Sequence, residues 1–301
     1  MQQIALILIC LGIGILLRLS KRLPDSATKV LGGWVINVAL PAAALRNVHG
    51  LKLGGDWIFA AATPWIGAFL AIAILVPLSR AFGWPARRTG ALLLIGGWGN
   101  TSFVGLPMIA AFAGNQWLGL GIVIDLFGSY LALSTLGLAI ATIAHAGHLD
   151  WRLVAKKIVT FPPFIAILIA LATNNIERPE WLIEIIGAIA RTLTPIALAA
   201  VGFALRLDKL AGHLAPLITG LGYRLFLAPL ALLVLYWAIG HAGDMVAKVA
   251  ILEMAMPPML GASIIAMDHD LEPELVALII GIGVPVSMLT ATLWWHVIAA
   301  F

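Results

Sequence analysis

Four ionisable residues stand in stretches of the chain that are otherwise apolar: Asp125, Arg191, Arg224 and Glu253. A charge at the centre of a bilayer costs about 2.5 to 3.5 kcal/mol on insertion scales, so such residues face partners or water and are candidates for function. A buried acid can carry a proton or ligate sodium, and an arginine can hold a carboxylate through two hydrogen bonds. The alternative is structural, because two acids and two bases can form two ion pairs, such as Asp125 with Arg224.

Two proline motifs interrupt apolar stretches close to these charges. The first, "NTSFVGLP" at residues 100–107, ends in Pro107, and the second, "MPPM", contains Pro257 and Pro258, four and five residues after Glu253. Proline removes a backbone donor, and the freed carbonyls survive in hydrocarbon only when buried in protein or lining a polar cavity. The first motif supplies three polar side chains, those of Asn100, Thr101 and Ser102.

We expect the two breaks to meet at mid-depth around a cavity. Half-helix N-termini there carry partial positive charge suited to an anion, whereas unwound carbonyls suit a cation. Asn100, Thr101 and Ser102 would then be donors to a bound anion. For one motif alone, the competing interpretation is a simple proline kink with its polar side chains bonded to the backbone.

The surrounding composition is that of a polytopic membrane protein. Of 301 residues, 62% are hydrophobic and 11% are charged, and the mean hydropathy is +1.05. These values lie outside the range of soluble domains. A crossing helix needs about 20 apolar residues. Ten segments qualify, with short connections that leave no room for a soluble domain: 2–19, 27–46, 57–79, 88–113, 116–144, 153–174, 180–205, 214–239, 245–267 and 272–299.

Basic residues in the connections predict the orientation, because short cytoplasmic loops are enriched in Lys and Arg. Twelve lie on one side: Arg18, Lys21, Arg22, Lys29, Arg80, Arg87, Arg88, Arg152, Lys156, Lys157, Arg206 and Lys209. Four lie on the other: Arg46, Lys52, Arg178 and Lys248. We therefore expect a multi-pass protein of the inner (plasma) membrane with both termini outside.

A weak internal repeat relates the two halves of the chain. "NVALP" begins at Asn37 in the second span and "RTLTP" begins at Arg191 in the seventh, and "GLPM" and "MPPM" correspond in the fourth and ninth. Five spans separate the members of each pair, so the halves, 1–145 and 146–301, have opposite orientations, as in many secondary transporters. Asn37 and Arg191 would then complete the pocket, with Arg191 selecting organic anions.

The chain resembles the auxin efflux carrier family, the bacterial relatives of the plant PIN carriers. The resemblance is carried by "NTSFVGLPMIAAFAG" and "AMPPMLGASIIAMDHDLEPELVALIIGIGVPVSMLTATLW" and extends over nearly the whole sequence. It implies ten transmembrane helices in two inverted five-helix repeats, with broken helices 4 and 9 crossing. It also implies a scaffold of spans 1, 2, 6 and 7 that forms homodimers, and a mobile transport part made of the rest. Asn100 matches the asparagine that contacts the substrate carboxylate in plant members.

These observations favour a secondary transporter of small organic anions, auxin-like or dicarboxylate, that works by elevator-type alternating access. Proton coupling is expected, through Glu253 or Asp125 with Arg224, because one acid suffices, whereas sodium needs several oxygens. A sodium-coupled symporter and a non-transporting membrane sensor remain alternatives. No enzyme is expected, since there is no H-E-x-x-H motif and no histidine at membrane depth. We expect no cofactor, metal or nucleic-acid partner, and Cys10 is a single cysteine in an apolar run.

Overall fold

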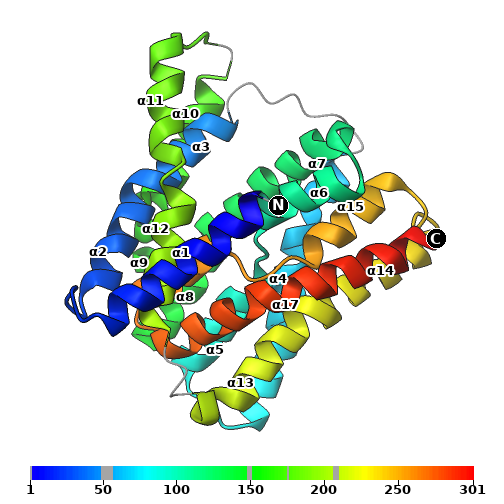
Figure 1. Ribbon diagram of the computed structural model, residues 1–301. Coiled ribbons are helices and arrows are strands. Elements are labelled where there is room, and N and C mark those ends of the chain that lie inside the picture. The colour runs from blue at the N-terminus through cyan, green and yellow to red at the C-terminus, as the bar shows by residue number, and fades with distance from the viewer. Residues whose placement is uncertain (1, 49–56, 148–150, 175, 206–209) are drawn as a thin grey trace.

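The computed structural model describes residues 2–48, 57–147, 151–174, 176–205 and 210–301, and this part of the chain is almost entirely helical (Figure 1). Lys52, Arg206 and Lys209, which entered the orientation prediction, lie outside the described residues. The first half contains α1 Gln2–Leu19, α2 Ala27–Trp34, α3 Leu40–Val48, α4 Trp57–Ala81, α5 Ala86–Gly97, α6 Leu106–Phe112, α7 Leu118–Val123 and α8 Leu138–Ala146. The second half contains α9 Trp151–Val159, α10 Pro162–Ala172, α11 Glu180–Ala190, α12 Leu193–Ala204, α13 Leu210–Gly222, α14 Ala228–Ala238, α15 Met245–Met254, α16 Leu260–Asp268 and α17 Pro273–Ala299.

Several of these helices are halves of one longer stretch. π-Helical turns join them at Val35–Ala39, Ile124–Tyr130, Leu133–Gly137 and Tyr223–Leu227, and another, Thr101–Gly105, leads into α6. Within the described residues, five stretches are long and apolar enough to cross a membrane: Trp57–Ala81, Leu118–Ala146, Glu180–Phe203, Leu210–Ala238 and Pro273–Ala299. The other segments expected to cross coincide with α1, with the helix that α2 and α3 form through their π-helical turn, or with stretches that are interrupted, namely α5–α6, α9–α10 and α15–α16. The chain is thus a helical membrane protein whose helices are frequently broken.

The helices pack in two groups (Figure 1). The smaller helix group consists of α1, α2, α3 and α9 to α12, in which α1 packs along α12 and α3 packs between α10 and α11, while α9 leads into α10 and also packs against α8 of the other group. Gly14 and Gly202 bring the backbones of α1 and α12 together, because a Cβ on either glycine would overlap backbone atoms of the other helix. The larger helix group consists of α4 to α8 and α13 to α17.

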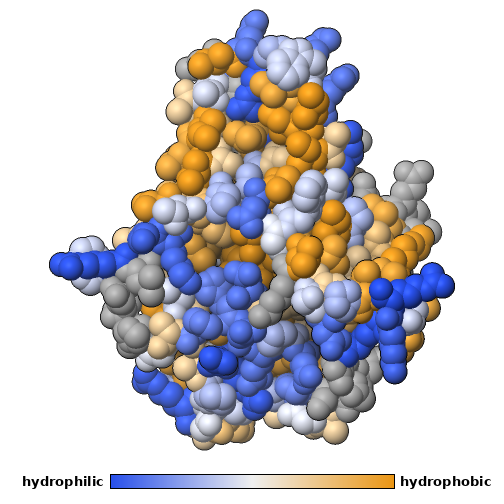
Figure 2. Space-filling model, turned by 90° about the vertical axis from the view of Figure 1, so that its left-hand side faces the viewer, coloured by the Kyte–Doolittle hydropathy of each residue, from blue (hydrophilic) through white to orange (hydrophobic). Residues whose placement is uncertain are grey.

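The core runs through the larger helix group. Every residue of α5 from Gly90 to Gly97 and of α16 from Leu260 to Met267 is buried. Segments that are apolar all round belong inside a protein rather than at its surface. By contrast, α10 and α11 expose large apolar side chains, and the upper part of the face in Figure 2 is correspondingly hydrophobic. These exposed residues include Ile165, Leu168, Ile169, Trp181, Ile183 and Ile185.

Candidate functional site

The site begins where two broken helices cross. The chain leaves α5 at Trp98 in an extended conformation, and it enters α16 from Met259 in an extended conformation. The two extended segments pair antiparallel at Gly99 and Pro258. The amide of Asn100 donates to the Pro257 carbonyl at 2.6 Å, and the amide of Met259 donates to the Trp98 carbonyl at 2.9 Å. The backbone groups freed by one break are therefore satisfied by the other, as burial in a membrane requires.

The two breaks have different local causes. Pro257 and Pro258 lie in the gap between α15 and α16, where neither can donate to a preceding carbonyl. Pro107, in contrast, lies in the first turn of α6, a position that helices tolerate. The first break begins at Trp98, upstream of the polar motif, so the expectation that Pro107 itself makes the break is wrong.

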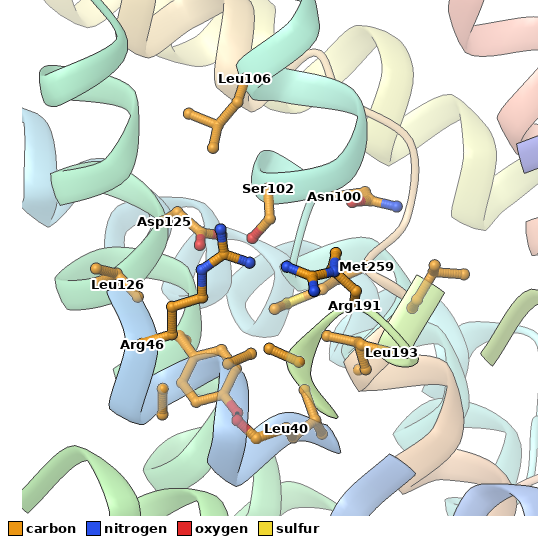
Figure 3. A pocket seen from close by; sticks show the side chains of 16 residues that line it. Leu40, Arg46, Asn100, Ser102, Leu106, Asp125, Leu126, Arg191, Leu193 and Met259 are labelled. Carbon is orange, nitrogen blue, oxygen red and sulfur yellow. Dashed lines mark hydrogen bonds between the residues drawn. The ribbon is translucent and has the colours of Figure 1, made fainter. Parts of the chain in front are cut away.

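A cavity of about 180 Å³ lies beside the crossing, between the two helix groups (Figure 3). The larger helix group contributes the polar side chains of Asn100, Ser102 and Asp125. The smaller group contributes Arg46 at the end of α3 and Arg191 between α11 and α12. The remaining walls are mostly apolar: Leu40, Ala43, Ala44, Leu106, Leu126, Tyr130, Ala190, Leu193, Met259, Leu260 and Gly261.

The two arginines meet at Gly187 of α11. A Cβ on Gly187 would lie 3.4 Å from Nη1 of Arg191 and 3.8 Å from Cζ of Arg46, so this glycine leaves room for both guanidinium groups. In Figure 3 both groups point into the cavity, toward the side formed by Asp125, Ser102 and Asn100. Two like charges on one wall raise the local potential and attract an anion.

Asp125 faces them from a π-helical turn and is 3% exposed. Its Oδ1 accepts a hydrogen bond of 2.5 Å from the Thr101 hydroxyl, which lies 3.1 Å from the Ser129 hydroxyl. Thr101 thus stands behind the cavity wall and holds the carboxylate rather than lining the cavity. The ion pair expected between Asp125 and Arg224 does not form, because Arg224 donates to the main-chain carbonyls of Met256 and Met254 instead.

Glu253 is the most enclosed acid of the site. It lies in the last turn of α15, is 1% exposed, and neither of its carboxyl oxygens has a hydrogen-bond partner among the described residues. A Cβ on Gly105 would overlap this carboxyl group, and one on Gly121 would lie 3.4 Å from its Oε1. The glycine two residues before Pro107 therefore makes space for Glu253.

The remaining predicted site residues are distributed more widely. Pro107, Pro257 and Pro258 shape the backbone but do not line the 180 Å³ cavity. Asn37 lies apart from Asn100, in a second cavity of about 230 Å³ that also contains Lys157 and His269. Arg46 was not identified as a site residue, because an arginine at the end of a span is typical of residues that only report orientation.

A hydrogen-bonded cluster closes one side of this second cavity. Nε2 of His269 lies 3.3 Å from Nζ of Lys157, while its Nδ1 lies 2.9 Å from the Ile265 carbonyl. Nδ1 is then the protonated nitrogen, and Nε2 accepts from the lysine. Burial lowers the pKa of His269, and Lys157 lowers it further. The His269 carbonyl lies 2.7 Å from Nδ1 of His145, so the cluster joins α8, α9 and the end of α16.

Comparison with known proteins gives concordant matches along the whole chain. A family model described as "Membrane transport protein" matches residues 1–295. An uncharacterized transporter of Methanothermobacter thermautotrophicus is 25% identical over 296 residues, which cover 97% of this chain and 96% of that protein. An uncharacterized transporter of Methanocaldococcus jannaschii is 22% identical over 303 residues, covering 98% and 97%.

Proposed function

The chain belongs to the membrane transport protein family, the auxin efflux carrier family, and we propose that this membrane transporter carries small organic anions by secondary transport. One observation supports this assignment most strongly. Two arginines of one helix group face Asn100, Ser102 and Asp125 of the other across a cavity at the helix crossing. Guanidinium groups pair with carboxylates in a fixed bidentate geometry, which suits a carboxylic acid substrate.

The cavity favours a small substrate. Its volume of about 180 Å³ is below the roughly 300 to 1,000 Å³ typical of pockets for drug-sized ligands. The walls are mostly apolar, with the polar groups concentrated on two sides. A short dicarboxylate, or a monocarboxylate with a compact apolar body, suits this arrangement. Its carboxylate would meet the polar sides, and its carbon skeleton would pack against the apolar walls.

The proposed mechanism is elevator-type alternating access. The smaller helix group would be the scaffold, and the larger group would carry Asn100, Ser102 and Asp125 past it. Cavities of about 180 and 230 Å³ lie between the same two groups, and each contains one member of the predicted repeat pair: Arg191 in the first and Asn37 in the second. The substrate would meet Arg191 in one state and Asn37 in the other. The apolar faces of α10 and α11 would form the homodimer, with both termini outside.

The same site offers a route for a coupled proton. Glu253 is buried and has no hydrogen-bond partner for its carboxyl group among the described residues, so this group is available to bind and release a proton. A buried space of about 10 Å³, near the limit for one water molecule, adjoins Glu253, Thr101 and Ser129. The two hydroxyl groups lead from it to Asp125 at the wall of the substrate cavity. Protonation of these acids would thereby accompany substrate binding.

A thermal-shift screen of the purified protein tests the substrate class. The panel should contain mono- and dicarboxylates and their neutral amides, each at pH 5.5 and 7.5. We expect at least one carboxylate to raise the Tm in a saturable way and its amide to have no effect, with a larger shift at the lower pH. If no carboxylate raises the Tm, or if the amides act equally well, the anion assignment is wrong.

A further inference from the structure

Arg224 lies where two helices end, and it is not part of the substrate cavity. It belongs to the π-helical turn Tyr223–Leu227 and is 2% exposed. Nε donates to the Met256 carbonyl at 2.9 Å, Nη1 to Gly96 at 3.4 Å, and Nη2 to Met254 at 2.6 Å and to Glu253 at 3.3 Å. All four acceptors are main-chain oxygens: three lie in the last turns of α5 and α15, and that of Met256 lies just beyond α15.

These carbonyls form a natural cation site. The last carbonyls of a helix have no partner within it, and each helix end carries roughly half a negative charge. In transporters with broken helices, such ends often coordinate the coupling Na⁺. Here the C-terminal ends of α5 and α15 converge inside the protein, so a positive charge placed between them is strongly stabilised.

The surroundings are shaped for the guanidinium. A Cβ on Gly99 would overlap Nη2 and lie 2.9 Å from Cζ, so the crossing closes over Arg224 only with glycine at this position. Each of the four hydrogen bonds of the side chain is donated to a carbonyl, and none goes to Asp125 or into the 180 Å³ cavity. Arg224 is therefore not placed to hold a substrate carboxylate.

We propose that the Arg224 guanidinium is a resident cation that occupies the carbonyl site at the crossing and replaces a bound metal ion. It is a positioning residue: it neutralises the two helix ends and holds α5 and α15 together in every state of the transport cycle. One consequence, that transport does not require Na⁺, rests on the proposed function. The arrangement argues against a sodium site at these carbonyls, because Arg224 already occupies the oxygens that sodium would use there.

The test is a cation series read by thermal unfolding, which needs no substrate. Wild type and Arg224→Ala are compared in NaCl, KCl and choline chloride at equal ionic strength, and in KCl with millimolar guanidinium. We expect the wild-type Tm to be the same in all four solutions. Arg224→Ala should have a lower Tm, and guanidinium should restore most of that loss in a saturable way, while Arg224→Lys should fall between the two.

Leu225→Ala is the matched control, because it removes a fully buried neighbour from the same turn without removing a charge. Guanidinium should leave its lowered Tm unchanged. A saturable rise of the wild-type Tm in Na⁺ over K⁺ and choline would overturn the proposal, as would guanidinium acting equally on Leu225→Ala. If Arg224→Ala does not fold, Arg224→Lys and the wild-type series decide. If no carboxylate acts in the substrate screen, the proposed substrate class is wrong. The cation series still tests the role of Arg224, because it uses no substrate.

Discussion

The backbone amide of Asn100 donates to the carbonyl of Pro257 at 2.6 Å, so the residue at the start of the polar motif is fixed to the proline pair of the other broken helix. With the Met259–Trp98 bond beside it, this pairing joins the two breaks into one unit. A movement that exposes Asn100 to the other side of the membrane must therefore carry both broken helices together. The side chain of Asn100 remains at the cavity wall while its backbone does the joining.

Removal of the arginines should weaken substrate binding. Arg191→Ala and Arg46→Ala each delete a guanidinium that faces the cavity, and hydrogen bonds to charged groups contribute about 1.5 to 3 kcal/mol. Each variant should therefore bind the carboxylate found in the screen about tenfold to a hundredfold more weakly, measured by isothermal titration. Arg80→Ala, at the exposed end of α4, is the control and should bind as wild type does. Equal affinities in all three variants would remove both arginines from the site.

The sequence predicts the breaks and the polar motif well because both depend on local chemistry. Apolar length predicts where helices run, and the Pro257–Pro258 pair cannot continue one. The position of the first break was less predictable, since Pro107 is compatible with the first turn of α6 and the chain leaves the helix at Trp98 instead. Because the two broken helices cross, Asn100 and Ser102 lie at a cavity beside the second break.

Which buried charges meet could not be read from the sequence. Asp125 and Arg224 carry opposite charges, yet Asp125 accepts from a hydroxyl group and Arg224 donates to main-chain carbonyls. Arg46 joins Arg191 only because α3 and α11 pack with Gly187 between the two side chains. Which buried side chains meet depends on how helices that are distant in sequence are rotated about their axes. Residue spacing within one segment does not predict this rotation.

Gly105 should be intolerant of any side chain while Glu253 is present. Its Cβ would overlap the Glu253 carboxyl group, and overpacking of a core costs about 1 to 3 kcal/mol. Gly105→Ala should therefore lower the Tm of wild type, but not that of Glu253→Ala, where the space is empty. Gly212→Ala is the control, because nothing lies within 4 Å of its Cβ. The account of this glycine fails if the penalty is the same in both backgrounds.

Glu253→Gln should flatten the pH dependence of transport. The amide keeps the size of the side chain, so the enclosure beside Gly105 is preserved, but it cannot exchange a proton. Uptake into proteoliposomes between pH 5.5 and 8 should fall with rising pH in wild type and vary little in the variant. Glu184→Gln, on the exposed face of α11, should keep the wild-type profile. An unchanged profile in Glu253→Gln would rule it out as the proton carrier.

Stability should fall at low pH through His269. Its pKa in the folded protein is lower than the ordinary value of 6.5, mainly because the ring is buried. The unfolded chain therefore takes up a proton first as the pH falls, and the folded state loses stability below about pH 6.5. Protonation also places a second charge beside Lys157, 3.3 Å from Nε2. The Tm of wild type should drop between pH 7.5 and 5.5, and His269→Gln should reduce that drop.

The control for this effect is His296→Gln, which alters an exposed histidine near the end of α17. Its pH-dependent drop in Tm should equal that of wild type. If His269→Gln loses as much stability as wild type over the same interval, the histidine cluster does not sense pH.

Transport through the cavity at the helix crossing is best examined by the flux of a labelled carboxylate into proteoliposomes, compared between wild type and Asn100→Ala. The substitution removes the polar side chain from the cavity and leaves the backbone pairing with Pro257 in place, so the variant should remain folded, which thermal unfolding checks. We predict saturable uptake by wild type and none above empty vesicles by the folded variant. Undiminished uptake by Asn100→Ala, or no uptake by wild type of a carboxylate that it binds, would contradict transport through a cavity at the helix crossing.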